Sequence, residues 1–176
     1  MSQPDLRALI RDVPDFPKPG IVFKDITPVL LDAVALDRAI ELLATDARDR
    51  EVEEVVAAEA RGFILGAALA ARAGAGFIPA RKPGKLSAAT ESVSYQLEYG
   101  VDTLEIHSGA LASGTRVLVH DDLLATGGTA AAKCRLAAEA GAEVVGCSFL
   151  VELSFLGGRE QLAPHEVFSL IQYESE

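Results

Sequence analysis

The sequence predicts an α/β domain whose doubly wound, mostly parallel sheet is flanked by helices. In two separate parts of the chain, short aliphatic runs alternate with stretches of helical periodicity, a pattern typical of strand–helix–strand units. Aromatic residues make up only 6% of the 176 residues and Trp is absent, so we expect helices to pack on the sheet through small aliphatic side chains. A chain of this length can bury one core of ordinary size, which indicates a single domain, 1–176.

The N-terminal part of the chain precedes this alternation. A short helix is expected first, followed by a surface loop from Pro14 to Gly20 that its prolines stiffen. From Ala33 to Arg50 the apolar residues recur on one helical face, and Asp32 is placed to cap that helix.

The first strand–helix–strand unit follows this helix. A strand is expected at Glu54–Ala58 and a helix at Gly62–Arg72. A Gly74-Ala75-Gly76 break ends the helix, and Phe77–Ala80 forms the next buried strand. The second unit repeats the pattern with a strand, a helix and a strand at Arg116–His120, Thr129–Ala140 and Glu143–Val151.

An irregular segment separates the two units. Residues Lys82 to Ser92 include Pro83 and Gly84 and show no periodicity, which is typical of a lid over a site. Ser94–Tyr99 and Thr103–His107 alternate enough to form an antiparallel addition near the sheet edge, and we expect this arm to cover the site.

Composition excludes several classes of function. The formal net charge of −10 leaves no general positive field for nucleic acid or anionic lipid, so nucleic acid and membranes are not expected partners. Charged residues interrupt the first twenty positions, and no apolar run approaches membrane-spanning length. Cys134 and Cys147 lack partners at metal-ligand spacing and are expected to be reduced core thiols. These features predict a soluble, cytoplasmic protein.

The most informative segment is Val117–Thr129, because it combines a strand, two acids and a glycine turn. The strand delivers Asp121 and Asp122 to its carboxyl end, where open parallel sheets bind ligands. Carboxylates accept hydrogen bonds from a vicinal diol. A phosphate monoester suits the amides, hydroxyls and helix N-terminus of Ala125, Thr126, Gly127, Gly128 and Thr129. Together the two halves predict a ribose 5-phosphate site.

A solvated surface turn with a helix cap is the alternative for this segment, and it requires two acids, two threonines and two glycines to coincide by chance. The segment is not a Walker loop, because no Lys follows its glycines, and it lacks the Gly-x-Gly-x-x-Gly fingerprint of dinucleotide sites.

The motif Asp121-Asp122-Leu123-Leu124-Ala125-Thr126-Gly127-Gly128-Thr129 closely resembles the phosphoribosyl pyrophosphate (PRPP) motif of type I phosphoribosyltransferases, in the form of their adenine-specific branch. His120 departs from the aliphatic residue expected there, and a packing role is predicted for it. The resemblance extends over nearly the whole chain: Phe16–Ile26 matches the small hood over the base, about residues 1–30, and Ser154–Leu162 matches the C-terminal region.

The resemblance also implies residue roles. For adenine it implies main-chain contacts from Val22 and Lys24 and packing on Phe23 and Leu123, although core packing is the alternative for the last two. For pyrophosphate it implies Arg61, at a helix N-terminus beside a Glu59–Ala60 peptide expected to be cis, together with Arg81, Lys82 and Lys85. The alternative for the last three is a solvated charged face.

The implied reaction transfers the phosphoribosyl group of PRPP to adenine, which yields AMP and pyrophosphate. Mg²⁺ is implied as the cofactor, held mainly by substrate oxygens and water rather than by protein ligands. Glu98 is the implied catalytic residue, exchanging a proton with adenine N7, and Tyr99 is a lid residue; the lid spans about residues 82–99. A homodimer is implied, with Arg81 reaching across it.

Two other functions stay open. A phosphoribosyltransferase for xanthine or guanine would need the hood to read a reversed base edge. A PRPP-sensing regulator would normally add a basic or winged-helix module, which this acidic chain lacks.

Overall fold

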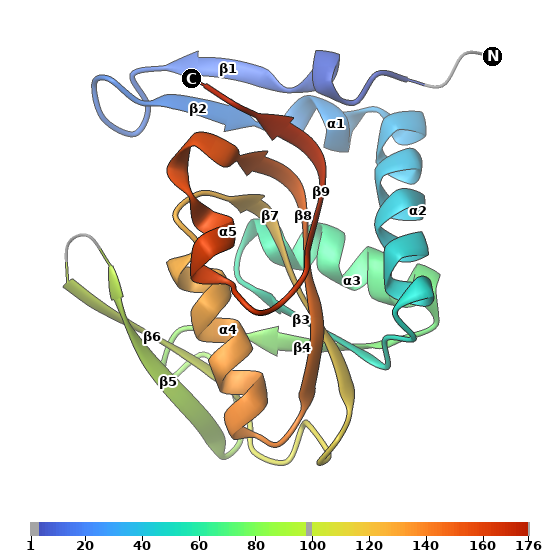
Figure 1. Cartoon of the computed structure of the whole chain (residues 1–176), viewed down its shortest axis with the longest axis vertical. Helices are drawn as coiled ribbons and strands as arrows, with labels where there is room; N and C mark the ends of the chain where they lie inside the picture. Colours follow the sequence, from blue (N-terminus) through green and yellow to red (C-terminus); the bar gives the residue numbers. More distant parts are fainter. Residues whose placement is uncertain (1–3, 98–99, 176) are drawn as a thin grey trace.

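The computed structural model describes residues 4–97 and 100–175. The core of this part of the chain is a five-stranded sheet in which all neighbouring strands are parallel. In spatial order the strands are β4 (Gly76–Ala80), β3 (Glu54–Ala58), β7 (Arg116–Leu124), β8 (Glu143–Leu153) and β9 (Val167–Tyr173). The parallel sheet flanked by helices is therefore confirmed (Figure 1).

Helices cover both faces of this sheet. Helices α2 (Ala33–Asp49) and α3 (Arg61–Ala73) pack together on one face, and α4 (Gly128–Glu139) packs on the other. The Asp32 carboxylate accepts hydrogen bonds from main-chain N–H groups at the start of α2, so the expected cap is confirmed. Gly74 ends α3 with φ of 80°, a left-handed conformation that favours glycine. None of the helices in 4–97 and 100–175 is both long and apolar enough to cross a bilayer.

Two features of the sheet differ from the expectation. Strand β7 runs to Leu124 instead of ending at His120, because its last residues pair with β8, Leu123 opposite Val151. The two acids thus lie within a strand rather than after it. Strand β9 was not predicted; it exists because β8 offers it a parallel edge, with Phe149 opposite Ser169.

The N-terminal residues form a β-hairpin, and the predicted loop from Pro14 to Gly20 connects its two strands. The predicted short N-terminal helix is present as a 3-10 helix of three residues, η1 (Arg7–Leu9). The chain then forms β1 (Arg11–Pro14), paired antiparallel with β2 (Val22–Asp25), and the proline-containing loop connects them. The short helix α1 (Thr27–Leu31) leads into α2. In Figure 1 the hairpin lies at the top of the molecule, where β8 and β9 end.

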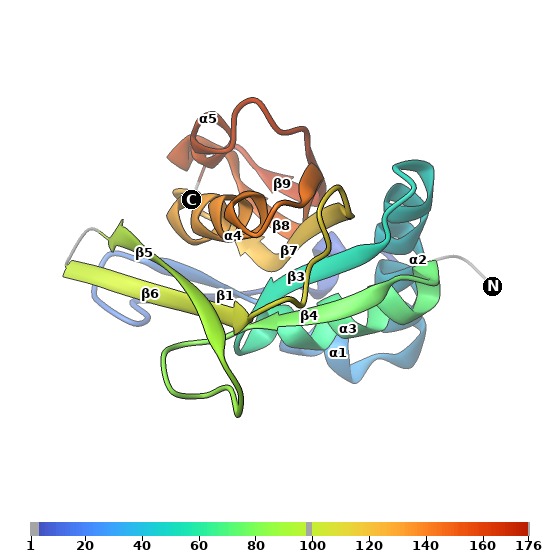
Figure 2. The same cartoon turned by 90° about the horizontal axis from the view of Figure 1, so that it is seen from below.

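The segment between the two units contains a second antiparallel hairpin. Strands β5 (Thr90–Leu97) and β6 (Gly100–His107) form their own two-stranded sheet, and a single bridge between Arg81 and Glu105 links β6 to the end of β4. The strands are longer than expected, which shortens the irregular segment before them. The hairpin packs beside α4, as Figure 2 shows.

The C-terminal part continues from β8 through the turn η2 (Ser154–Leu156) and the short helix α5 (Gly158–Gln161) into β9. The two thiols, from α4 and β8, are free and buried with their Sγ atoms 3.5 Å apart, which confirms the expected core position of Cys134 and Cys147.

Candidate active site

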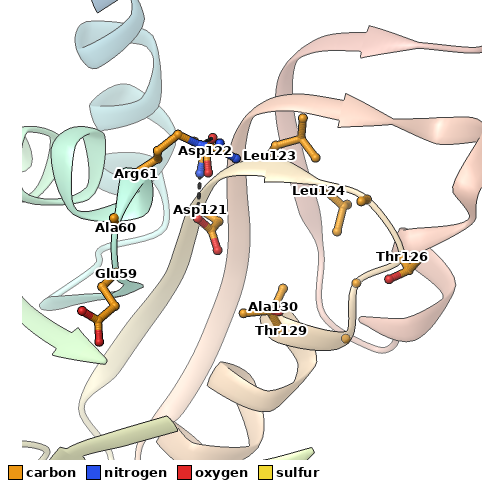
Figure 3. Close-up of a pocket in the computed structure, with 13 residues that line it drawn as sticks. Glu59, Ala60, Arg61, Asp121, Asp122, Leu123, Leu124, Thr126, Thr129 and Ala130 are labelled. Carbon is orange, nitrogen blue, oxygen red and sulfur yellow. Dashed lines mark hydrogen bonds and ion pairs between the residues drawn. The ribbon is translucent and has the colours of Figure 1, made fainter. Parts of the chain in front are cut away.

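A cavity of about 360 Å³ opens at the carboxyl end of β7, between the end of β3 and the start of α4 (Figure 3). Its lining consists of one segment after β3 and the whole β7–α4 connection. These residues are Glu59, Ala60, Arg61, Asp121, Asp122, Leu123, Leu124, Ala125, Thr126, Gly127, Gly128, Thr129 and Ala130. The structure therefore brings the predicted diol and phosphate residues together in one pocket.

The loop before α4 has the geometry of an anion site. Gly127 has φ of 88°, which only glycine adopts at little cost. Helix α4 starts directly after it, so the first amides of the helix have no partners within the helix and point toward the pocket end. The hydroxyl-bearing side chains of Thr126 and Thr129 also line the cavity. The loop packs tightly on α5, since a Cβ added to Gly158 would lie 2.3 Å from the Ala125 carbonyl oxygen.

The carboxylate of Asp121 is held by the protein on both oxygens. Its Oδ2 accepts from Lys133 Nζ at 2.7 Å, and its Oδ1 accepts from the main-chain N–H of Asp122 at 3.0 Å. Burial opposes ionisation of this group, but the Lys133 ammonium outweighs burial and holds the pKa of Asp121 below its usual value. Asp121 is thus a fixed negative charge.

The neighbouring carboxylate, Asp122, is in a different electrostatic environment. Burial raises its pKa to about 6, the charge of Asp121 adds to this shift, and Arg61 opposes it. Its Oδ2 accepts from Arg61 Nε at 2.6 Å. Two adjacent carboxylates therefore have pKa values displaced in opposite directions, an arrangement that is common at functional sites.

Arg61 connects the pocket to the N-terminal hairpin. Its guanidinium carbon lies 4.9 Å from the centroid of the Phe23 ring, and that ring meets Phe16 edge-on at 5.1 Å. Leu123 lines the pocket nearby, whereas Val22, partly buried beside Phe23 in β2, does not line it. Of the two residues predicted to pack on the base, Phe23 from the hairpin lies against Arg61, and Leu123 from β7 is part of the pocket lining.

Lys24 directs its side chain away from the pocket. Its ammonium donates to Asp12 at 2.8 Å and lies 4.3 Å from the centroid of the Tyr173 ring. Only the main chain of Lys24 is left for a ligand. Within the described residues β2 has a strand neighbour on one edge only, so its other edge presents main-chain donors and acceptors.

The other predicted pyrophosphate residues gather around Glu59 and do not line the pocket. Arg81 donates to the Glu59 carboxylate at 2.8 Å, and the main-chain N–H of Lys82 donates to the other oxygen of this carboxylate, also at 2.8 Å. Lys82 Nζ lies 3.2 Å from Asp102, and Lys85 is exposed. Of the four predicted cations, the structure brings only Arg61 into the lining. The Glu59–Ala60 peptide is cis, as the resemblance implied.

The predicted catalytic residue Glu98 and the lid residue Tyr99 lie outside the described residues. The described parts of the β5–β6 hairpin contact α4 and do not contribute to the pocket lining. The described residues of this arm therefore lie outside the cavity.

Two polar residues at the site, the buried Lys133 and the partly exposed Glu59, were not recognised as important from the sequence. Lys133 and Glu59 are engaged by site residues, and a signal existed for Lys133, because it interrupts the apolar face of α4. His120 is wholly buried, and burial lowers its pKa to about 3, so that its imidazole is neutral. Its Nδ1 lies 3.0 Å from Ser148 Oγ, in agreement with the expected packing role.

The fold and the pocket together define a phosphoribosyltransferase, and comparisons with known proteins give the same class. Residues 30–171 match a family model described as a phosphoribosyl transferase domain. A relative named adenine phosphoribosyltransferase, from Syntrophotalea carbinolica, is 57% identical over 169 residues, which cover 96% of this chain and 99% of the relative. The chain belongs to the adenine phosphoribosyltransferase family.

Solved structures give the same result. The adenine phosphoribosyltransferase of Thermoanaerobacter pseudethanolicus superposes with a TM-score of 0.92 at 52% identity, over 96% of this chain and 98% of that one. The Giardia lamblia enzyme, solved with 9-deazaadenine, superposes with a TM-score of 0.91 at 37% identity, over 99% of both chains. The resemblance drawn from the sequence is confirmed.

Proposed function

We propose that this chain transfers the 5-phosphoribosyl group of PRPP to adenine, forming AMP and pyrophosphate in purine salvage. The observation that carries the proposal is the β7–α4 connection, where two carboxylates and a phosphate-type loop line a single cavity. Its membership of the adenine phosphoribosyltransferase family and the adenine analogue bound by the Giardia lamblia relative support adenine as the base.

PRPP is proposed to bind along the β7–α4 connection. The amides and hydroxyls from Ala125 to Thr129 hold the 5′-phosphate, and the helix N-terminus favours its negative charge. Asp121 and Asp122 accept from the ribose hydroxyls. Because Asp122 is paired with Arg61 in this structure, ribose binding and release of Arg61 are coupled.

Pyrophosphate is proposed to bind Arg61 on the side away from the ribose site. The Arg61 side chain is 47% exposed, so it can exchange Asp122 for a phosphate oxygen without a rearrangement of the core. Arg81, Lys82 and Lys85 provide further positive charge beyond Glu59, and they reach the leaving group only after their segment moves toward the pocket.

Mg²⁺ fits this arrangement as a substrate-bound ion. In residues 4–97 and 100–175 no three His, Cys, Asp or Glu side chains cluster as metal ligands, and both pocket aspartates already pair with cations. The ion would therefore be held by PRPP oxygens and water, and when bound it neutralises charge on pyrophosphate.

Adenine is proposed to stack between Phe23 and Leu123, with its Watson–Crick edge read by main-chain groups of Val22 and Lys24. An amino purine presents an adjacent donor and acceptor, which a strand edge can match. N9 then approaches C1′ opposite the leaving group, through an oxocarbenium-like transition state. Glu98 exchanges the N7 proton as general acid–base, and Tyr99 helps to close the lid of residues 82–99.

A cytoplasmic homodimer is the proposed assembly. Helices α1 and α2 expose two large apolar side chains, Leu31 at 81% and Val34 at 66%, which a second copy could cover.

The main proposal is tested by incubating the protein with PRPP, Mg²⁺ and adenine, guanine or xanthine in turn. AMP formation with adenine is expected. The proposal would be contradicted if a nucleotide formed only with guanine or xanthine, or if none of the three bases gave a nucleotide.

A further inference from the structure

We infer that Lys133, in the middle of α4, is a positioning residue for PRPP that acts through Asp121. The inference rests on the proposed function, and it concerns a side chain that does not line the pocket. Lys133 is not in the pocket lining, and its side chain is wholly buried.

The Lys133 ammonium joins two elements of the site. It donates to the His120 carbonyl oxygen at 2.7 Å and to Asp121 Oδ2 at 2.7 Å, both within β7. Lys133 follows Thr129 by one helical turn, so the two residues lie on the same side of α4. One buried cation therefore ties the diol carboxylate to the helix whose N-terminus forms the phosphate loop.

The surroundings of Asp121 leave it little freedom. Asp122 donates its main-chain N–H to Oδ1 at 3.0 Å, and a Cβ added to Gly62 would lie 2.7 Å from the same oxygen. Strand, helix α4 and the first turn of α3 thus enclose the carboxylate. Because Lys133 holds the remaining oxygen, it decides both the charge and the orientation that Asp121 offers to a ligand.

The charge balance explains why a lysine can occupy this core position. A buried ammonium is stable only when it is paired and hydrogen-bonded, and Asp121 is the carboxylate that pairs with it. The nearby His120 is neutral and cannot compensate either charge. The two aspartates therefore have different roles. Lys133 holds Asp121 in a fixed position, whereas Asp122 exchanges its partner Arg61 for the ligand.

The test measures steady-state constants for the Lys133→Met protein with PRPP, Mg²⁺ and adenine. Methionine keeps most of the length of the side chain but removes the charge and the hydrogen bonds. We expect KM for PRPP to rise roughly 10- to 100-fold, the range for lost charge-assisted hydrogen bonds, while KM for adenine stays unchanged. Leu136→Ala is the matched control, because Leu136 is buried in the same helix and should lower the melting temperature without changing KM for PRPP.

A double-mutant cycle tests whether Lys133 acts through Asp121. In an Asp121→Asn background, adding Lys133→Met should change PRPP affinity by no more than about twofold. The double variant also removes both buried charges together, so it remains informative if Lys133→Met alone fails to fold. A full additional loss in the double variant, or equal losses for PRPP and adenine that follow the melting temperature, would overturn the inference.

The wild-type protein separates this inference from the proposed function. If the wild type forms no AMP, the proposed function fails, whatever Lys133 does. If the wild type is active and Lys133→Met has a normal KM for PRPP, only the inference about Lys133 fails.

Discussion

Arg61 Nε and Asp122 Oδ2 lie 2.6 Å apart, so the cation assigned to pyrophosphate and a carboxylate assigned to ribose are bound to each other. The two side chains differ in burial, with 47% of Arg61 and 7% of Asp122 exposed. We therefore expect Arg61 to be the partner that moves when PRPP binds. The proposed binding replaces one ion pair with two new contacts, ribose hydroxyls on Asp122 and phosphate oxygens on Arg61.

Arg61→Ala should separate the two ligands of the pocket. PRPP carries pyrophosphate and AMP does not, so we expect PRPP affinity to fall roughly 10- to 100-fold, as for a lost charge-assisted contact, with little change for AMP. Calorimetric titration of both ligands checks this. Arg72→Ala is the control, because Arg72 makes ion pairs with Asp37 and Glu41 outside the pocket. A similar loss for AMP and PRPP would contradict the role of Arg61.

Asparagine substitutions of the two aspartates should have unequal effects on stability. Asp121→Asn leaves the buried Lys133 ammonium without its counter-charge, which typically costs about 3–5 kcal/mol. Asp122→Asn removes a carboxylate whose ionisation the fold already disfavours and leaves only the half-exposed Arg61 unpaired, so it should cost little. Urea unfolding at pH 8 measures both changes. Equal destabilisation would show that the two environments do not differ as the structure indicates.

PRPP binding should depend on pH through Asp122, whose pKa is about 6. Since this pKa is raised above its ordinary value, ionisation is disfavoured in the folded state, and the stability contribution of Asp122 falls as pH rises through about 6. Its capacity to accept two hydroxyl hydrogen bonds changes in the opposite direction, so PRPP affinity should increase between pH 5 and pH 7.

The control for this pH dependence is Asp122→Asn, because a phosphate monoester also titrates with a pKa of about 6. Calorimetry across the pH range should show a shallower dependence for the variant than for the wild type. Parallel curves for the two proteins would assign the whole effect to the ligand.

Gly158→Ala should damage the phosphate loop from outside the pocket. The added Cβ would lie 2.3 Å from the Ala125 carbonyl oxygen and 2.9 Å from Leu124 Cδ1, so that the loop must shift. AMP and PRPP should both weaken by about tenfold or more, because both carry the 5′-phosphate, and overpacking should cost about 1–3 kcal/mol of stability. Glu160→Ala, an exposed position in the same helix, is the comparison. Normal AMP binding in the Gly158→Ala protein would argue against this packing role.

Glu98→Gln should affect chemistry rather than binding. Glutamine keeps the size and hydrogen bonding of the side chain but cannot exchange a proton, so the single-turnover rate should fall by roughly 10²–10⁴-fold. Adenine affinity should change little if the hairpin backbone supplies most of the recognition. Rapid quenching with saturating PRPP and Mg²⁺ avoids a limit set by product release. A near-normal single-turnover rate would remove Glu98 from the mechanism.

The sequence by itself determined the local elements and the position of the main motif. Hydrophobic periodicity and glycine breaks predicted β3, α3, β4 and α4 within a residue or two, because these signals depend on neighbours close in the chain. The acids, glycines and threonines from Asp121 to Thr129 likewise lie in one continuous segment. Their order alone predicted a diol site beside a phosphate site at the end of a strand.

The tertiary structure decided the partners of these residues. Arg61 meets Asp122 across 61 positions of sequence, and Lys133 reaches back to Asp121 only because α4 folds against β7. Strand β9 also depends on an edge that another segment supplies, the parallel edge of β8. Periodicity encodes which side of an element is buried, but the choice of partner depends on distances between elements, and therefore the opposite pKa shifts of Asp121 and Asp122 arise only in the folded chain.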